Sequence, residues 1–100
     1  MREIVYSTQF KKDAKKFKSQ KHDIKTLEKV IEMLVNDIPL PPERKDHMLV
    51  GNYKGIRDCH IEDDWVLLYT KENGEINILH LVRLTSHSEL FDIKKRIKVR

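Results

Sequence analysis

The sequence lacks the residues and runs that define several classes of protein. Cys59 is the single cysteine among 100 residues, so no disulfide can form within the chain, which fits a reducing cytoplasm. No stretch approaches the ~20 apolar residues of a membrane span, and the N-terminus carries no signal-like apolar run. The composition therefore predicts a soluble, cytoplasmic protein with no membrane partner.

Several catalytic and cofactor motifs are missing as well. The sequence contains no glycine-rich phosphate loop, no dinucleotide fingerprint and no serine nucleophile elbow. Its five histidines and one cysteine show neither His-x-x-x-His nor Cys-x-x-Cys spacing. We therefore expect no cofactor and no metal, and a metal site is kept as the main alternative use of the histidines.

Positive charge, by contrast, is plentiful. Lys and Arg number 20 against 16 Asp and Glu, which gives a formal charge of +4. Lysines crowd residues 11–25, and a basic tail covers residues 92–100. Such a balance favours a polyanionic partner such as RNA or DNA, although helix lysines often only solvate an outer face.

Hydrophobic periodicity predicts a single α+β domain over residues 1–100. The expected order is strand, helix, helix and then three strands in a meander, at residues 2–6, 8–19, 24–38, 56–61, 65–70 and 76–83. Asn73-Gly74 is typical of a hairpin turn, and Pro39 is expected to stop the second helix. We predict a small antiparallel sheet of about four strands, with the N-terminal αα-hairpin packed on one face.

Several local features refine this prediction. Ser7 or Thr8 is expected to cap the first helix and Asp23 the second, and Ser86 or Ser88 a short C-terminal helical turn. Residues 39–55 form a long connection of the kind that is often functional. Strict alternation puts Arg83 on the same face as the apolar Leu79 and Leu81. This predicts that the strand bulges, that it ends before Arg83, or that Arg83 points in another direction.

The densest chemistry lies between Arg57 and Trp65, where His60 is surrounded by carboxylates, and His47 and His87 bracket this stretch. Metal-free RNA cleavage needs a base for the 2′-hydroxyl, an acid for the leaving oxygen and a cation for the phosphate. Histidine suits the first two roles and arginine the third. The sequence offers candidates for all three: His47, His60, His87, Asp64, Arg57 and Arg83.

Each candidate also has a simpler structural explanation. A strand histidine such as His60 is often a satisfied structural residue, and His22 and His80 are interpreted as surface and strand residues without a role. Tyr53, Trp65 and Phe91 are able to stack on unpaired bases, but Trp65 is better explained as a core residue. Cys59 alternates with His60, so we expect it to face the core without acting as a nucleophile.

Read together, these residues resemble the YafQ branch of the RelE/ParE toxin superfamily. The similarity rests on Lys-Asp-His at 45–47, Gly-Asn-Tyr-Lys-Gly-Ile-Arg-Asp-Cys-His-Ile at 51–61, Asp-Trp-Val-Leu-Leu-Tyr at 64–69, and Arg83 followed by His-Ser-Glu-Leu-Phe at 87–91. It spans nearly the whole chain up to Phe91. Two departures stand out: Thr85 occupies a position where many relatives carry glycine, and the basic tail extends beyond the point where relatives often stop.

The resemblance implies a type II toxin that enters the ribosomal A site as a metal-independent endoribonuclease and cuts mRNA. It implies catalytic roles for His47, His60, Asp64 and His87, a phosphate contact for Arg83 and an mRNA-orienting aromatic at Phe91. Trp65 matches a family position too. The implied partners are the ribosome, mRNA and a cognate antitoxin that neutralises the toxin and represses the shared operon as a complex.

On this hypothesis, docking on ribosomal RNA is assigned to the exposed side of the first helix, through Lys11, Lys12, Lys15 and Lys16. Arg57 is expected to hold phosphate together with Arg83. Two alternatives use the same scaffold: a non-enzymatic toxin like the gyrase-poisoning ParE branch, and an RNA-binding module that does not cut. The ParE branch does not need histidines at these positions, so their presence favours the nuclease.

Overall fold

The computed structural model describes residues 1–49 and 55–96, and side chains as far as residue 91. The elements follow in the order β1 (Glu3–Tyr6), α1 (Thr8–Ser19), α2 (Ile24–Val35), a 3₁₀ turn η1 (Pro42–Arg44), β2 (His47–Met48), β3 (Arg57–Glu62), β4 (Trp65–Glu72), β5 (Ile78–Ser86) and α3 (His87–Arg96). This order confirms the predicted sequence of elements. No helix among the described residues is long and apolar enough to cross a membrane.

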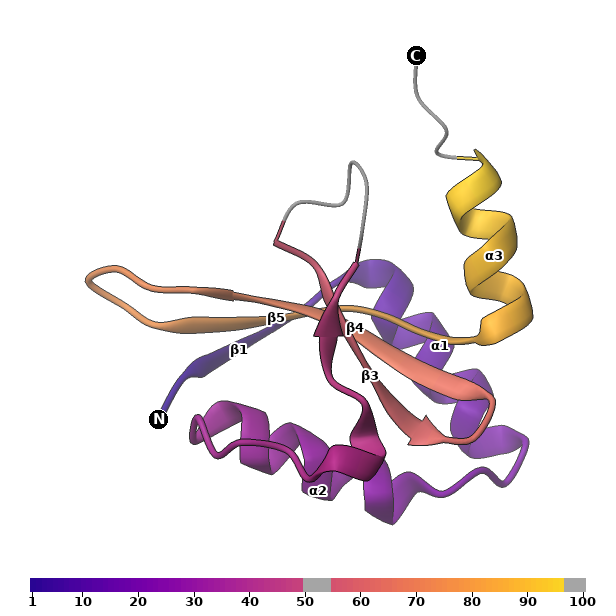
Figure 1. The fold of residues 1–100 in the computed structure, drawn as a ribbon, viewed down its shortest axis with the longest axis horizontal. Coiled ribbons are helices and arrows are strands. Elements are labelled where there is room, and N and C mark those ends of the chain that lie inside the picture. The colour runs from indigo at the N-terminus through magenta and orange to yellow at the C-terminus, as the bar shows by residue number, and fades with distance from the viewer. Residues whose placement is uncertain (50–54, 97–100) are drawn as a thin grey trace.

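Five strands of the described chain form one sheet in the order β1-β5-β4-β3-β2 (Figure 1). The pairings of β3, β4 and β5 are antiparallel, as predicted, and β2 also pairs antiparallel with β3. β1, however, runs parallel to β5, because the αα-hairpin and the later strands form a long crossover between them. The fifth strand is β2, a two-residue element inside the connection predicted over residues 39–55.

Each helix begins directly after a capping residue that was predicted from the sequence. The Ser7 hydroxyl accepts from the Phe10 amide at 2.8 Å, and the Asp23 carboxylate accepts from the Thr26 amide at 3.0 Å. At α3 the Ser86 hydroxyl accepts from the Glu89 amide at 3.2 Å, while the Glu89 carboxylate accepts from the Ser86 amide at 3.4 Å. This reciprocal pair is a capping box, and it fixes the start of α3 at His87.

α2 ends at Val35, earlier than the proline-based prediction. The Ile38 amide donates to the Met33 carbonyl and the Asp37 amide to the Leu34 carbonyl. Asp37 adopts a left-handed backbone with φ 56°. This is a Schellman motif, which ends the helix before Pro39 is reached. α3 is also longer than the predicted short turn and continues to Arg96, so residues 92–96 of the expected tail are helical.

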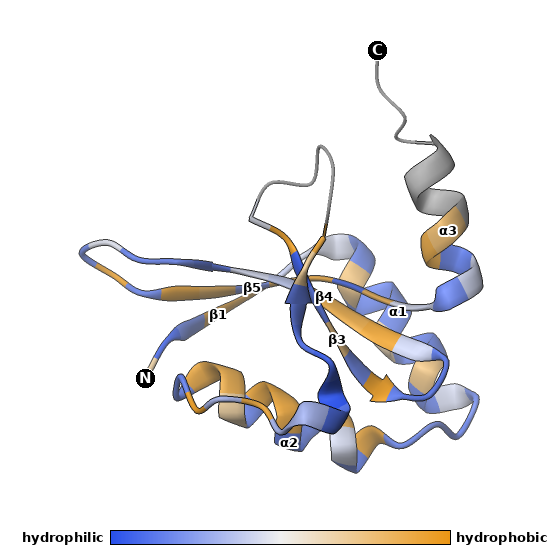
Figure 2. Cartoon of the chain, viewed as in Figure 1, coloured by the Kyte–Doolittle hydropathy of each residue, from blue (hydrophilic) through white to orange (hydrophobic). Residues whose placement is uncertain are grey.

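The main core lies between the sheet and the αα-hairpin, as Figure 2 shows by the apolar side of α2 turned toward the strands. The predicted stripe of α1 is confirmed, with Phe10 and Phe17 buried and Ala14 packed against the same core. A second, smaller apolar cluster covers part of the opposite face of the sheet; among the described residues it buries Leu49, Val66, Leu68 and Leu90, with Ile56 and Val82 packed against them. Most of that face therefore lies outside the main core.

A bulge in β5 explains why Arg83 does not have to share a face with the buried Leu79 and Leu81. Leu68 pairs with Arg83 while the next residue, Tyr69, pairs with Leu81, so Val82 is the extra residue on β5. The bulge resets the alternation, and Leu84 joins Leu79 and Leu81 in the main core. β5 therefore continues through Ser86 and delivers His87 at its end.

Candidate active site

His60 and His87 lie side by side at one end of the sheet. Their ring centroids are 4.8 Å apart with an interplanar angle of 57°. His60 comes from β3, and His87 is the first residue of α3. Two histidines at this separation place an acid and a base within reach of the same phosphate.

The β3–β4 turn fixes the position of His87. The His87 amide donates to the Asp64 carbonyl oxygen at 3.0 Å, and the Asp64 carboxylate lies 3.5 Å from Nδ1 of His87. Backbone and side chain of Asp64 therefore both orient the first residue of α3. This carboxylate is also in ion-pair distance of the His87 ring when that ring carries a proton.

His47 is the third histidine of this group. Its Nδ1 lies 2.8 Å from the Lys45 carbonyl oxygen and 3.1 Å from Oδ1 of Asp58. Because a carbonyl oxygen only accepts, the Nδ1 that bonds to Lys45 carries the hydrogen of that bond. Asp58 is only 4% exposed and shares a strand face with His60, two residues along β3.

The surroundings of His60 favour its neutral form. Burial lowers the pKa of His60 below its ordinary value of 6.5, and the positive charges of His87, Lys45 and His47 lower it further, whereas Asp58 acts in the opposite direction. A neutral imidazole near pH 7 is the form that accepts a proton. The electrostatics thus suit His60 to the role of base.

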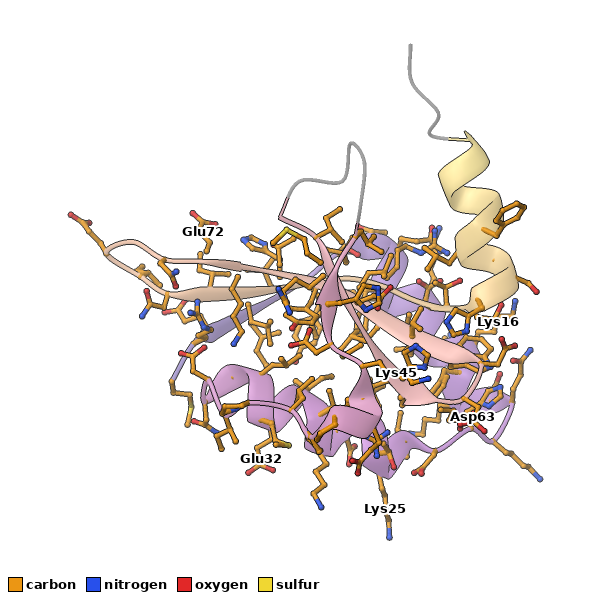
Figure 3. The ribbon with its side chains drawn as sticks, in the orientation of Figure 1. Lys16, Lys25, Glu32, Lys45, Asp63 and Glu72 are labelled. Atoms are coloured by element: carbon orange, nitrogen blue, oxygen red, sulfur yellow. The ribbon has the colours of Figure 1, made fainter. Side chains whose placement is uncertain are left out.

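A cavity of about 420 Å³ opens beside His60, between η1 and the end of β3. It is lined by Glu43, Arg44, Lys45, His60, Ile61, Glu62 and Asp63. Figure 3 shows Lys45 and Asp63 near the β3–β4 turn, on the same side of the molecule. The volume lies within the ~300–1,000 Å³ typical of small-ligand sites.

Arg83 lies beside α1 and does not line this cavity. Its guanidinium donates to both carboxylate oxygens of Asp13, at 2.7 and 3.3 Å. The same carboxylate accepts from the Leu84 amide at 3.0 Å, because β1 ends at Tyr6 and leaves this part of the β5 edge without a strand partner. Arg83 lines a separate hollow that also includes Lys12, Lys16, Trp65 and Glu89.

The other predicted binding residues are spread over the surface. Arg57 is on the helix side of the sheet, where its Nε donates to Asp46 at 3.1 Å, so the structure does not bring it to the histidines. Phe91 is 63% exposed on α3, one residue after the buried Leu90. The four α1 lysines that were assigned to RNA docking are all exposed, and Figure 3 shows Lys16 next to the base of α3. Tyr53 lies outside the described residues.

The core interpretations of Trp65 and Cys59 are confirmed. Trp65 packs edge-on against Phe17 at 5.3 Å, and Cys59 is fully buried, with burial raising the pKa of its thiol to about 12. The interpretation of His22 as a plain surface residue was wrong. Its ring stacks on Phe17 at 4.9 Å and its Nδ1 lies 3.0 Å from Oε1 of Glu62, so it joins the α1–α2 turn to β3.

Sequence reasoning missed two residues of this site. Asp58 was identifiable from its i, i+2 spacing to His60, which puts both side chains on one strand face. Lys45 was identifiable from its place two residues before His47. In the described part of the chain, no group of three or more His, Cys, Asp or Glu side chains is arranged to hold a metal ion.

The fold and this histidine cluster define a small α+β protein with a group of histidines and carboxylates on the face of the sheet opposite its helical hairpin. A family model described as "Bacterial toxin of type II toxin-antitoxin system, YafQ" matches residues 2–92. The chain therefore belongs to the YafQ family of type II toxins.

Individual relatives agree with this assignment. Over 91 residues the chain is 38% identical to the "mRNA interferase toxin YafQ" of Escherichia coli K12, covering 90% of this chain and 96% of the relative. The E. coli DinJ–YafQ complex matches with a TM-score of 0.80 and 38% identity, over 91% of this chain and 99% of that chain. A metal-bound toxin from Helicobacter pylori matches with a TM-score of 0.84 and 44% identity, over 91% and 100%.

Proposed function

We propose that this toxin is an endoribonuclease that cuts mRNA in the ribosomal A site and so halts translation. The observation that carries the proposal is the His60–His87 pair, with ring centroids 4.8 Å apart and His47 and Asp64 beside it. The naming of the E. coli relative as an mRNA interferase supports the same activity.

The proposed reaction is a transesterification within the RNA strand. His60, whose lowered pKa keeps it neutral, takes the proton of the 2′-hydroxyl as that oxygen attacks phosphorus. The bond from phosphorus to the 5′-oxygen breaks, and protonated His87 gives its proton to this leaving oxygen. The products are a 2′,3′-cyclic phosphate and a free 5′-hydroxyl, so protons and bonds balance without a co-reactant.

The remaining residues hold the strand in this proposal. Lys45 lines the cavity beside His60 and supplies a positive charge for the reacting phosphate. The hollow with Lys12, Lys16 and Arg83 takes the RNA backbone farther from the cut, and Phe91 stacks on a base. The exposed lysines of α1 dock on ribosomal RNA, and such contacts weaken steeply as salt is raised.

We also propose a cognate antitoxin as the neutralising partner, because E. coli YafQ has been crystallised in a toxin–antitoxin complex with DinJ. The H. pylori relative is described as metal-bound. The acid, the base and the cation proposed for this chain are all side chains, so the reaction as written needs no metal.

The test is a primer-extension map of one mRNA in a reconstituted translation mix. Wild type is expected to give cuts at fixed positions within A-site codons, and these cuts disappear in His87→Ala and in the absence of ribosomes. His80→Ala is the matched control, because His80 pairs with Glu72 on the β4–β5 arm and is outside the cluster. Intact mRNA with wild type, or full cutting by His87→Ala, would refute the proposal.

A further inference from the structure

On the helix side of the sheet, two polar side chains donate to the same carboxylate oxygen of Asp46. Oδ1 of Asp46 accepts a hydrogen bond from the Tyr69 hydroxyl at 2.6 Å and one from Nε of Arg57 at 3.1 Å. Tyr69 belongs to β4 and is 1% exposed, whereas Arg57 begins β3. A residue from the connection before β2 is thus bonded to two neighbouring strands.

Asp46 directly precedes His47, the first residue of β2. Successive residues of an extended chain point to opposite sides, so Asp46 bonds on the helix side while His47 lies beside Asp58 on the other. β2 itself is short: it pairs through His47 with Asp58 and through Met48 with Arg57, and the Leu49 amide then donates to the Ile56 carbonyl oxygen at 2.9 Å. An edge strand of this length has little pairing of its own to fix its position.

The contacts of His47 depend on the placement of this same backbone. Its Nδ1 donates to the Lys45 carbonyl oxygen at 2.8 Å, and it lies 3.1 Å from Oδ1 of Asp58, which is within ion-pair distance when the ring is protonated. Lys45 has a left-handed backbone with φ 48°, a conformation that a lysine rarely adopts without support. A shift of about 1 Å at a supporting residue is enough to cost a reaction ~10²-fold.

We propose that Asp46, Arg57 and Tyr69 form a positioning network that holds His47 in its reactive orientation from the opposite face of the sheet. The inference rests on the nuclease proposed above and adds three positioning residues to it. It also assigns Arg57 to the support of His47 instead of to phosphate. Burial and the Asp46 carboxylate both raise the pKa of Tyr69, which keeps its hydroxyl protonated as the donor the network needs.

Tyr69→Phe is the variant of choice because it removes the hydroxyl and keeps the ring that fills the core. Tyr6→Phe is the matched control, since Tyr6 is half-exposed on β1. Each substitution is made in the wild-type background and in His47→Ala, and A-site cleavage rates are measured with ribosomes saturating. Thermal unfolding of every variant verifies that the protein is folded at the assay temperature.

The network predicts that Tyr69→Phe slows cleavage about ten-fold in the wild type and not at all in His47→Ala, because contacting residues that act together are strongly non-additive. Tyr6→Phe has no effect in either background. Equal slowing by Tyr69→Phe in both backgrounds, or no slowing in the wild type, would overturn the proposal.

A second measurement does not depend on nuclease activity. The imidazole nitrogen resonances of His47, assigned by comparison with His47→Ala, are expected to shift in Tyr69→Phe and to stay unchanged in Tyr6→Phe. Unchanged His47 resonances in Tyr69→Phe would sink the network. If wild type fails to cut mRNA at all, the proposed function falls, and this spectrum alone decides whether the network positions His47.

Discussion

The two faces of the sheet differ in composition and in burial. The face under α1 and α2 carries a continuous apolar core, and its charged groups are engaged in pairs such as Asp13–Arg83 and Asp46–Arg57. The opposite face has the smaller apolar cluster and the histidine group, with the buried Asp58 beside His47. Burial on the first face stabilises the fold, while on the second face the half-buried His60 and the exposed His47 and His87 are accessible to a substrate.

The difference between the faces is made by neighbouring residues of the same strand, which point to opposite sides of the sheet. Cys59 and His60 are adjacent, yet one is fully buried in the main core and the other pairs with His87. Asp46 and His47 divide in the same way between the two sides. Since the side-chain period of a strand is two, a change of one position in register would exchange the core set for the catalytic set.

The largest expected effect is the loss of cleavage rate on substituting His60, compared with the neighbouring Cys59. His60→Ala should slow cleavage by ~10²–10⁴, the usual contribution of a positioned acid or base, with little change in unfolding. Cys59→Ala should leave the cleavage rate unchanged and lower the free energy of unfolding by about 1 kcal/mol, as for other small buried truncations. Primer extension and urea titration of both variants test this, and a Cys59→Ala variant as inactive as His60→Ala would contradict the separation of the faces.

Truncation within the two apolar clusters gives the next effect. Phe17 is fully buried in the main core, so Phe17→Ala should cost ~3–5 kcal/mol of unfolding free energy. Leu90, from the smaller cluster, is 6% exposed, and Leu90→Ala should cost about 2 kcal/mol, the low end for a leucine whose site is able to collapse. Denaturant melts measure both values, and equal losses would mean that the smaller cluster stabilises the fold as strongly as the main core.

The sequence predicted most of the fold because local signals agree with the final packing. The stripe of Phe10, Ala14 and Phe17 and the caps Ser7 and Asp23 all reappear as expected. The parallel pairing of β1 and the two-residue β2 were not predictable, because both depend on contacts between distant segments. The end of α2 was misplaced because the Schellman motif at Asp37 stops it before Pro39.

The candidate site was predictable only in part, for a similar reason. Residue types and the family resemblance indicated His47, His60, Asp64 and His87, and the structure groups them. The side to which an arginine points was not readable from its type. Arg83 bonds to Asp13 of α1 because of the bulge at Val82 and the uncovered β5 edge, and Arg57 bonds to Asp46 on the helix face.

The pH dependence of cleavage should shift modestly and in opposite directions in two variants. Because the pKa of His60 is lowered from 6.5, the acidic limb of the rate profile should lie below pH 6.5 in the wild type. Removing the positive charge in Lys45→Gln raises the pKa of His60 and moves the limb to higher pH, by less than about one unit. Asp58→Asn removes the charge that favours protonated His60 and moves the limb to lower pH. Single-turnover rates from pH 5 to 8 measure this, and shifts in the same direction would exclude His60 as the titrating base.

The smallest expected effect is that of removing transition metals. If the face with the histidine group acts through its side chains alone, the chelator 1,10-phenanthroline should not change the cleavage rate. This chelator leaves the Mg²⁺ needed by ribosomes largely in place. The chemistry gives a sharp contrast, because an imidazole that donates its lone pair to a metal cannot also accept the proton of a 2′-hydroxyl. Metal added to the untreated toxin should then slow cleavage by occupying His47 or His60. Loss of cleavage in the chelator, restored by adding Zn²⁺ or Cu²⁺ back, would instead place a metal in the reaction and remove the base role from the histidine that binds it.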